Sequence, residues 1–127
     1  MYFILIFNDY KFEPTAVIDH TLLKQEAREA EVAKLCQEAF EHSFAAVCVN
    51  GCWAQFALQT LRALHAQSPD KQPVKVACVV GFPLGASTSE TKAFETKQLV
   101  EVRLRPHRFV TAGADVCIVC RVRRCVW

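Results

Sequence analysis

The sequence has 127 residues, of which 52% are hydrophobic and 22% are charged, and its net charge is +2. This length suits one ordinary domain, and this composition excludes a chain that stays disordered. No apolar run approaches the length of a membrane-spanning helix, so we expect no membrane partner.

The first predicted element is an N-terminal extension over residues 1–15. Its opening, MYFILIF, is apolar but lacks the basic lead and the small-residue cleavage site of a secretory signal peptide. We therefore expect a strand or a docking segment at this position, and a cytoplasmic protein.

Strands and helices are predicted to alternate along the chain. Three short apolar runs predict strands over residues 15–23, 44–50 and 74–80. A helical pattern follows each run, over residues 29–42, 53–67 and 88–100. This alternation is typical of βα units and predicts an α/β fold with a parallel sheet.

Two of the helical patterns carry local detail. The first places its apolar residues at the i, i+3, i+4, i+7 and i+8 positions of one face. These residues are Val32, Leu35, Cys36, Ala39 and Phe40. At the start of the third pattern, Ser87 and Glu90 predict a capping box, in which each side chain accepts from the other residue's backbone N–H.

In parallel α/β folds, chemistry collects where strands end and helices begin. Three predicted strand ends carry residues that a buried strand does not need. They are Asp19-His20-Thr21, Cys48-Val49-Asn50 and Gly81-Phe82-Pro83-Leu84-Gly85. Structural alternatives stay open: Asp19 can equally cap a helix or turn, Asn50 can form a turn, and Cys48 can be a packed small residue. We expect His20 to be structural or exposed.

The Gly81–Gly85 segment has two interpretations. The backbone amides of its glycines can approach an anion, with a helix N-terminus behind them. Alternatively, the segment is a tight loop that is apolar because Phe82 and Leu84 line a cavity at the ends of the strands and pack against its neighbours.

Seven cysteines are an odd number, and Cys36, Cys48 and Cys78 lie inside apolar patterns. Buried reduced thiols explain this distribution better than a disulfide framework does. Cys117 and Cys120 have the spacing of a metal or redox pair. No second pair or histidine accompanies them, so we expect no metal site.

Positive charge is concentrated at the C-terminal end. Residues 1–102 hold nine Lys+Arg and twelve Asp+Glu, a net charge of −3. Residues 103–127 hold six arginines and one acid, a net charge of +5. A basic tail can bind nucleic acid, or it can be sequence that does not belong to the preceding domain. Because these arginines do not alternate with aromatic residues, we expect no nucleic-acid partner.

Four motifs together resemble the deoxyribose-phosphate aldolase family. They are IDHTLLK (18–24), AAVCVN (45–50), VVGFPLG followed by ASTSETKAFE (79–95), and AGAD (112–115). The resemblance implies a partial (βα)8 TIM barrel with about the first three to four βα units. It implies three parts, namely the extension, a partial aldolase barrel over residues 16–115, and a divergent basic tail over residues 116–127.

The resemblance also implies a function. The family's lyases cleave 2-deoxy-D-ribose 5-phosphate into glyceraldehyde 3-phosphate and acetaldehyde through a Schiff base, in deoxyribonucleotide catabolism, without a metal or an organic cofactor. Asp19, Thr21, Cys48 and Asn50 match positions at the family's substrate pocket. The position of the family's catalytic aspartate holds Ile118, and its two functional lysines match no residue here. We therefore assign no catalytic residue and expect a truncated chain that is inactive alone.

Two alternatives to this function stay open. One is a non-catalytic half-barrel interaction module, and the other is a different barrel enzyme that handles phosphates. Half a barrel leaves a sheet edge unpaired and an apolar surface open, which favours a homo-oligomer.

Overall fold

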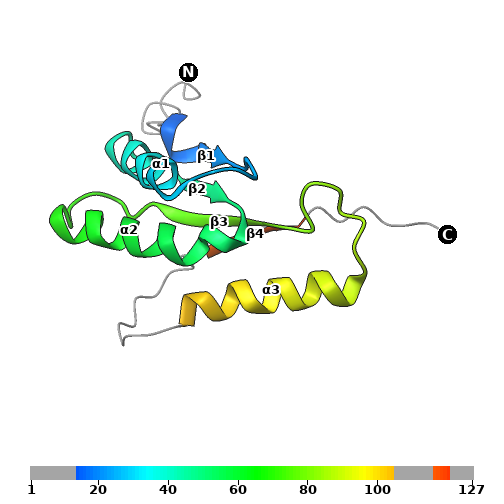
Figure 1. Ribbon diagram of the computed structural model, residues 1–127. Coiled ribbons are helices and arrows are strands. Elements are labelled where there is room, and N and C mark those ends of the chain that lie inside the picture. The colour runs from blue at the N-terminus through cyan, green and yellow to red at the C-terminus, as the bar shows by residue number, and fades with distance from the viewer. Residues whose placement is uncertain (1–13, 105–115, 121–127) are drawn as a thin grey trace, which may run out of the picture.

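The computed structural model describes residues 14–104 and 116–120 (Figure 1). In this part of the chain, four strands form one sheet in the order β1-β2-β3-β4, and every neighbouring pair is parallel. The strands are β1 (Asp19–Leu22), β2 (Ala46–Val49), β3 (Lys75–Val80) and β4 (Val116–Cys120). The α-helices are α1 (Glu29–Glu41), α2 (Ala54–Gln67) and α3 (Ser89–Leu104). The 3-10 helices are η1 (Pro14–Val17) and η2 (Gly51–Trp53).

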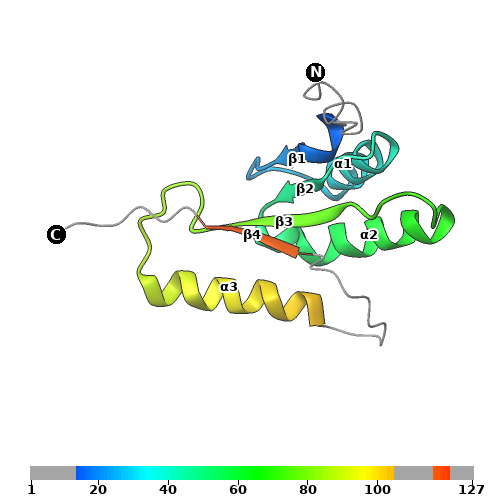
Figure 2. The ribbon, with the colours of Figure 1, turned by 180° about the vertical axis from the view of Figure 1, so that it is seen from behind.

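This arrangement confirms the predicted α/β fold with a parallel sheet. A helix lies between each strand and the next, and each new strand joins the sheet beside the preceding one. Strand order that follows chain order is the connectivity of one section of a (βα)8 barrel. Figure 2 shows the sheet from behind, with β4 next to β3.

The helices pack on one face of the sheet. Alternate residues of β2 and β3 point to this face because side chains alternate along a strand. Five of them are fully buried there: Val47, Val49, Val76, Cys78 and Val80. All five apolar residues predicted for the first helix are buried on α1 in the same cluster. Each buried valine stabilises the fold by roughly 1.5–3 kcal/mol.

We call the opposite face of the sheet the inner face. It carries a second, smaller cluster. Its buried residues are Ala46, Cys48, Ala77 and Val79, with Leu23 packed against them. Among the described residues, no member of α1, α2 or α3 belongs to this cluster. The inner face therefore has no helical layer in the described part of the chain.

The strand predicted over residues 15–23 is too long. Residues Pro14–Val17 form η1 instead, and the Ile18 N–H donates to the Thr15 carbonyl oxygen at 3.2 Å. Proline favours the first position of such a turn, since its ring fixes φ and no N–H is needed there. β1 therefore begins at Asp19, four residues later than predicted.

The predicted capping box at Ser87 and Glu90 is also wrong. α3 begins at Ser89, which places the N-cap position at Thr88. The Thr88 hydroxyl accepts from the Thr91 N–H at 3.3 Å. Threonine and serine are both favoured N-caps, so the helix start decides which of them is used.

Several predictions fall outside the described residues, namely MYFILIF, AGAD at 112–115, and the arginines after Cys120. The three-part division of the chain stays a prediction. The first five residues of the predicted tail form β4 and join the sheet. No helix in the described part is long and apolar enough to cross a membrane.

Candidate functional site

Two of the four predicted site residues are neighbours across the sheet. Thr21 of β1 is in register with Cys48 of β2, and Cys48 is in register with Ala77 of β3. Cys48 and Ala77 belong to the inner face. Because residues in register point to the same side of a parallel sheet, Thr21 lies on this face too. These residues form one row, on the side that faces the interior of a closed barrel.

Asp19 lies on the same side of the sheet but at its opposite end. It is the first residue of β1 and is in register with Ala46, which is in register with Lys75. These are the first residues of their strands. The expectation that Asp19-His20-Thr21 forms the carboxyl end of a strand is therefore wrong, since β1 ends at Leu22.

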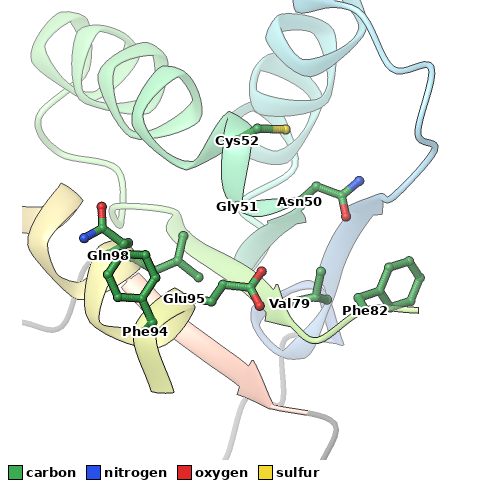
Figure 3. Close-up of a pocket in the computed structure, with 9 residues that line it drawn as sticks. Asn50, Gly51, Cys52, Val79, Phe82, Phe94, Glu95 and Gln98 are labelled. Atoms are coloured by element: carbon green, nitrogen blue, oxygen red, sulfur yellow. The ribbon is translucent and has the colours of Figure 1, made fainter. Parts of the chain in front are cut away.

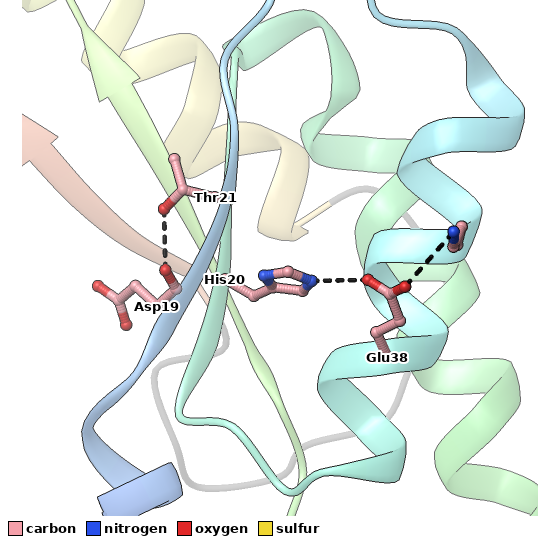
Figure 4. Close-up of polar contacts among 5 residues, drawn as sticks. Asp19, His20, Thr21 and Glu38 are labelled. Atoms are coloured by element: carbon pink, nitrogen blue, oxygen red, sulfur yellow. Dashed lines mark hydrogen bonds and ion pairs between the residues drawn. The ribbon is translucent and has the colours of Figure 1, made fainter.

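His20 points away from the inner face and joins β1 to α1 (Figure 4). Its Nε2 lies 2.8 Å from Glu38 Oε2, and its ring meets Phe44 edge-on with centroids 5.4 Å apart. The hydrogen bond with His20 lowers the pKa of the Glu38 carboxyl, and Lys34, 3.7 Å away, lowers it further. The contacts bear out the structural reading of His20.

Two of the predicted site residues, Asp19 and Asn50, line different cavities. The first, of about 620 Å³, lies at the amino ends of the strands and is lined by Asp19 and Lys75. The second, of about 480 Å³, lies at the carboxyl ends of β2 and β3 against α3, and Asn50 lines it (Figure 3). The structure therefore brings Asp19, Thr21 and Cys48 to one face and places Asn50 beyond the end of β2.

The Glu95 side chain of α3 binds the Gly81 N–H, which was one of the two candidate anion-binding amides. The Gly81 N–H donates to Glu95 Oε2 at 2.9 Å, and the Gly85 N–H donates to the Gly81 carbonyl oxygen at 2.6 Å. Both N–H groups are therefore engaged within the described part of the chain, which leaves neither of them available to an anion. Phe82, which is 40% exposed, lines the second cavity, as the alternative interpretation expects, whereas Leu84 is 80% exposed and lies outside that lining.

Lys92 and Glu95 hold this loop in place, a role that the sequence analysis missed. Lys92 Nζ donates to the Gly85 carbonyl oxygen at 2.9 Å, so the two side chains hold both ends of the loop. Gly81 and Gly85 have φ of +66° and +67°, a region that glycine adopts readily. The detectable signal was the spacing of Lys92, Glu95 and the buried Leu99 at i, i+3 and i+7 of one helix face.

We expect Glu95→Ala to lower the free energy of unfolding by about 1–2 kcal/mol, because the Gly81 N–H loses a charged acceptor in a half-buried site. Hydrogen exchange at the Gly81 amide should become faster, and denaturant unfolding measures the stability. Glu95→Gln keeps an oxygen acceptor and serves as the matched control. Equal losses in the two variants would show that this hydrogen bond does not hold the loop.

Ile118, at the position expected for a catalytic aspartate, lies in β4 in register with Cys78. Cys78 belongs to the cluster on the helical side of the sheet. The row that contains Thr21 and Cys48 continues to Cys117 instead. Among the described residues, no three His, Cys, Asp or Glu side chains are grouped to hold a metal ion.

Curated proteins similar to this chain are deoxyribose-phosphate aldolases. The chain is 51% identical to the one from Geobacillus sp. (strain WCH70) over 85 residues, which are 67% of this chain and 34% of that protein. It is 53% identical to the one from Halalkalibacterium halodurans over 85 residues, 67% and 35% of the two chains. The chain spans 34% to 38% of the length of these curated relatives and of the one from Clostridium kluyveri. No family model matches the chain.

Solved structures similar to this chain are also deoxyribose-phosphate aldolases. A candidate deoxyribose-phosphate aldolase from Coccidioides immitis is 32% identical with a TM-score of 0.63, over 71% of this chain and 32% of that chain. A tetrameric deoxyribose phosphate aldolase from Aeropyrum pernix is 28% identical with a TM-score of 0.57, over 69% and 34%. The four-stranded sheet is thus similar to part of these folds.

Proposed function

The part of the chain that matches these relatives belongs to the deoxyribose-phosphate aldolase family, and on this premise we propose that its sheet forms one wall of a sugar-phosphate pocket in an aldolase barrel. The observation that carries this proposal is the inner-face row of Thr21 and Cys48. Both residues lie in family motifs, and both lie on the side of the sheet that a barrel encloses.

The proposed roles follow from the side-chain chemistry. Thr21 Oγ1 donates to the Asp19 carbonyl oxygen at 2.8 Å, which leaves its lone pairs able to accept from a sugar hydroxyl. The Asp19 carboxylate can only accept hydrogen bonds, for example from the sugar hydroxyl groups. Cys48 contributes a small apolar side chain to the wall of the pocket. Asn50 can both donate and accept. Because Asn50 shares its cavity with the Glu95 carboxylate, the substrate phosphate binds elsewhere in the barrel.

The described lysines are unsuited to form the Schiff base. A Schiff-base lysine must be neutral, which requires desolvation or a second cation nearby. Five of the six described lysines are exposed. The sixth, Lys92, is half-buried, and its Nζ donates to the Gly85 carbonyl oxygen. The proposed contribution of this chain is therefore binding surface, and the reactive amine belongs to other strands of the barrel.

Borohydride reduction tests this assignment. We expect the 127-residue chain, incubated with 2-deoxyribose 5-phosphate and reduced, to show no adduct above background in intact-protein mass spectrometry. The same chain unfolded in guanidinium gives the background, since it has the same lysines without the fold. A native-state adduct on one lysine, above that background, would overturn the assignment and identify the amine.

A non-catalytic half-barrel module is the second candidate function. Two features of residues 14–104 and 116–120 favour it: the outer edges of β1 and β4 have no partner strand, and the inner face has no helical layer. We propose that the chain is in either case a barrel component that requires further strands, and a soluble location in the cytoplasm accords with its metabolic relatives.

A further inference from the structure

The cavity between η2, the end of β3 and α3 has a buried apolar floor and an aromatic rim. Leu99 and Val79, which are 4% and 8% exposed, form the floor. A Cβ atom at Gly51 would lie 3.1 Å from Leu99 Cδ2, so η2 packs closely on α3 beneath the cavity. Phe82 and Phe94, which are 40% and 65% exposed, form the rim. The volume of about 480 Å³ is typical of a small-molecule site.

The charge of this cavity comes from α3. Within the described part of the chain, the lining includes the carboxylate of Glu95 but no lysine, arginine or histidine side chain. The side chains of Asn50 and Gln98 in the lining are neutral amides. Lys92 also lies on α3, but its Nζ donates to the Gly85 carbonyl oxygen and it does not line the cavity. The cavity is therefore negative, and a cation would balance it.

The Glu95 carboxylate is held in position and keeps acceptor capacity. Its Oε2 accepts from the Gly81 N–H at 2.9 Å, while no residue of 14–104 or 116–120 donates to its Oε1. A carboxylate accepts up to about four hydrogen bonds, so further donors can bind there. Figure 3 shows this carboxylate between Phe94 and Phe82 in the lining.

We propose that this cavity binds a small primary ammonium ion with an aromatic body, the chemical class of the arylalkylamines. An ammonium group has three N–H donors, which can bind the Glu95 carboxylate and the side-chain oxygens of Asn50 and Gln98. The rings of Phe82 and Phe94 attract a cation over their faces and cover its apolar body. An anion of the same shape would be repelled by the Glu95 charge.

This inference does not rest on the proposed function. Thr21 and Cys48, which carry that proposal, do not line the cavity. Asn50 belongs to both proposals, so neither test uses a variant of Asn50. The proposed function is tested by a covalent adduct with a sugar phosphate, whereas this inference is tested by reversible binding of an amine, and the two can fail separately.

Cys52 is an exposed thiol in the lining, and its alkylation reports whether the cavity is occupied. With phenethylamine as the probe at about four times its Kd, we expect iodoacetamide to modify Cys52 about fivefold more slowly. Phenylacetate and phenethyl alcohol have the same ring without the positive charge, and they should require at least about tenfold higher concentrations for equal protection. The chain unfolded in guanidinium corrects for any reaction between probe and reagent.

Three variants locate the bound amine. Glu95→Gln keeps an acceptor for the Gly81 N–H but removes the charge, and it should weaken phenethylamine binding at least about tenfold. Glu90→Gln makes the same change at an exposed position of α3 outside the lining, and it should leave the affinity unchanged. Gln98→Lys, at an exposed lining position three residues from Glu95, supplies a competing cation and should also weaken binding. Circular dichroism checks that each variant retains its helices.

Three outcomes would overturn the proposal. The first is alkylation of Cys52 at an unchanged rate at every soluble concentration of phenethylamine. The second is equal protection by the amine, the alcohol and the carboxylate, which would indicate apolar binding without recognition of charge. The third is a folded Glu95→Gln variant with the affinity of the wild-type chain. If Glu95→Gln does not fold, Gln98→Lys decides, and an unchanged affinity in that variant removes the proposal.

Discussion

Replacing Val76 by aspartate is expected to unfold the domain, with a loss of more than about 4 kcal/mol in the free energy of unfolding. Val76 is 0% exposed and lies in β3, between Val47 of β2 and Val116 of β4. A carboxylate at this position would lose its hydration in an apolar layer. No buried polar or charged side chain of the described residues is available to bind it.

Circular dichroism and denaturant unfolding measure this effect, and two variants make it specific. Lys75→Asp introduces the same side chain one residue earlier, at an exposed position of the same strand, and should change stability by less than about 1 kcal/mol. Val76→Ala removes volume without adding charge and should cost about 2 kcal/mol while the fold is retained. A folded Val76→Asp with near-normal stability would show that the helical layer does not exclude water from β3.

The predicted fold agrees with the structure wherever burial alone decides the element. The face of α1 and the apolar strand β3 have one stable arrangement, because only a helix or a doubly covered strand buries all of their apolar residues. Local errors occur where two physical solutions compete. Pro14–Val17 can extend or turn, and the ring of Pro14 favours the turn. Ser87 and Thr88 can both cap, and the start of α3 selects Thr88.

The candidate site was less predictable, because it depends on register and on contacts between distant residues. An error of a few residues in the start of β1 moved Asp19 from the expected strand end to the opposite end of the sheet. The pairing of Glu95 with the Gly81 amide joins residues fourteen positions apart across a loop. Periodicity assigns Glu95 to a helix face but does not state which loop that face meets.

The cysteines show how strand alternation divides one residue type between environments. Cys48 points to the inner face, whereas Cys78 points to the helical side, where it is 0% exposed. Burial raises the pKa of Cys78 to about 12, with nearby Cys48, Cys52 and Glu95 adding to the shift. Burial likewise raises the pKa of Cys36 to about 11. Cys52, in contrast, is exposed.

Alkylation at pH 8 should therefore modify Cys52 at least about 100-fold faster than Cys36 or Cys78, since roughly one in 10³ to 10⁴ of the buried thiols is ionised. Peptide mass spectrometry over a time course of iodoacetamide treatment measures the three rates, and chain unfolded in guanidinium should react at all three sites alike. The raised pKa values also set a pH dependence. The Cys78 thiol has a pKa of 9.0 in the unfolded chain and of about 12 in the folded protein. The stability that is present below pH 9 is therefore lost progressively as the pH rises toward 12. Native Cys78 that reacts as fast as Cys52 would mean that β3 and the helices separate readily, and the helical layer would then not be the stable part of this sheet.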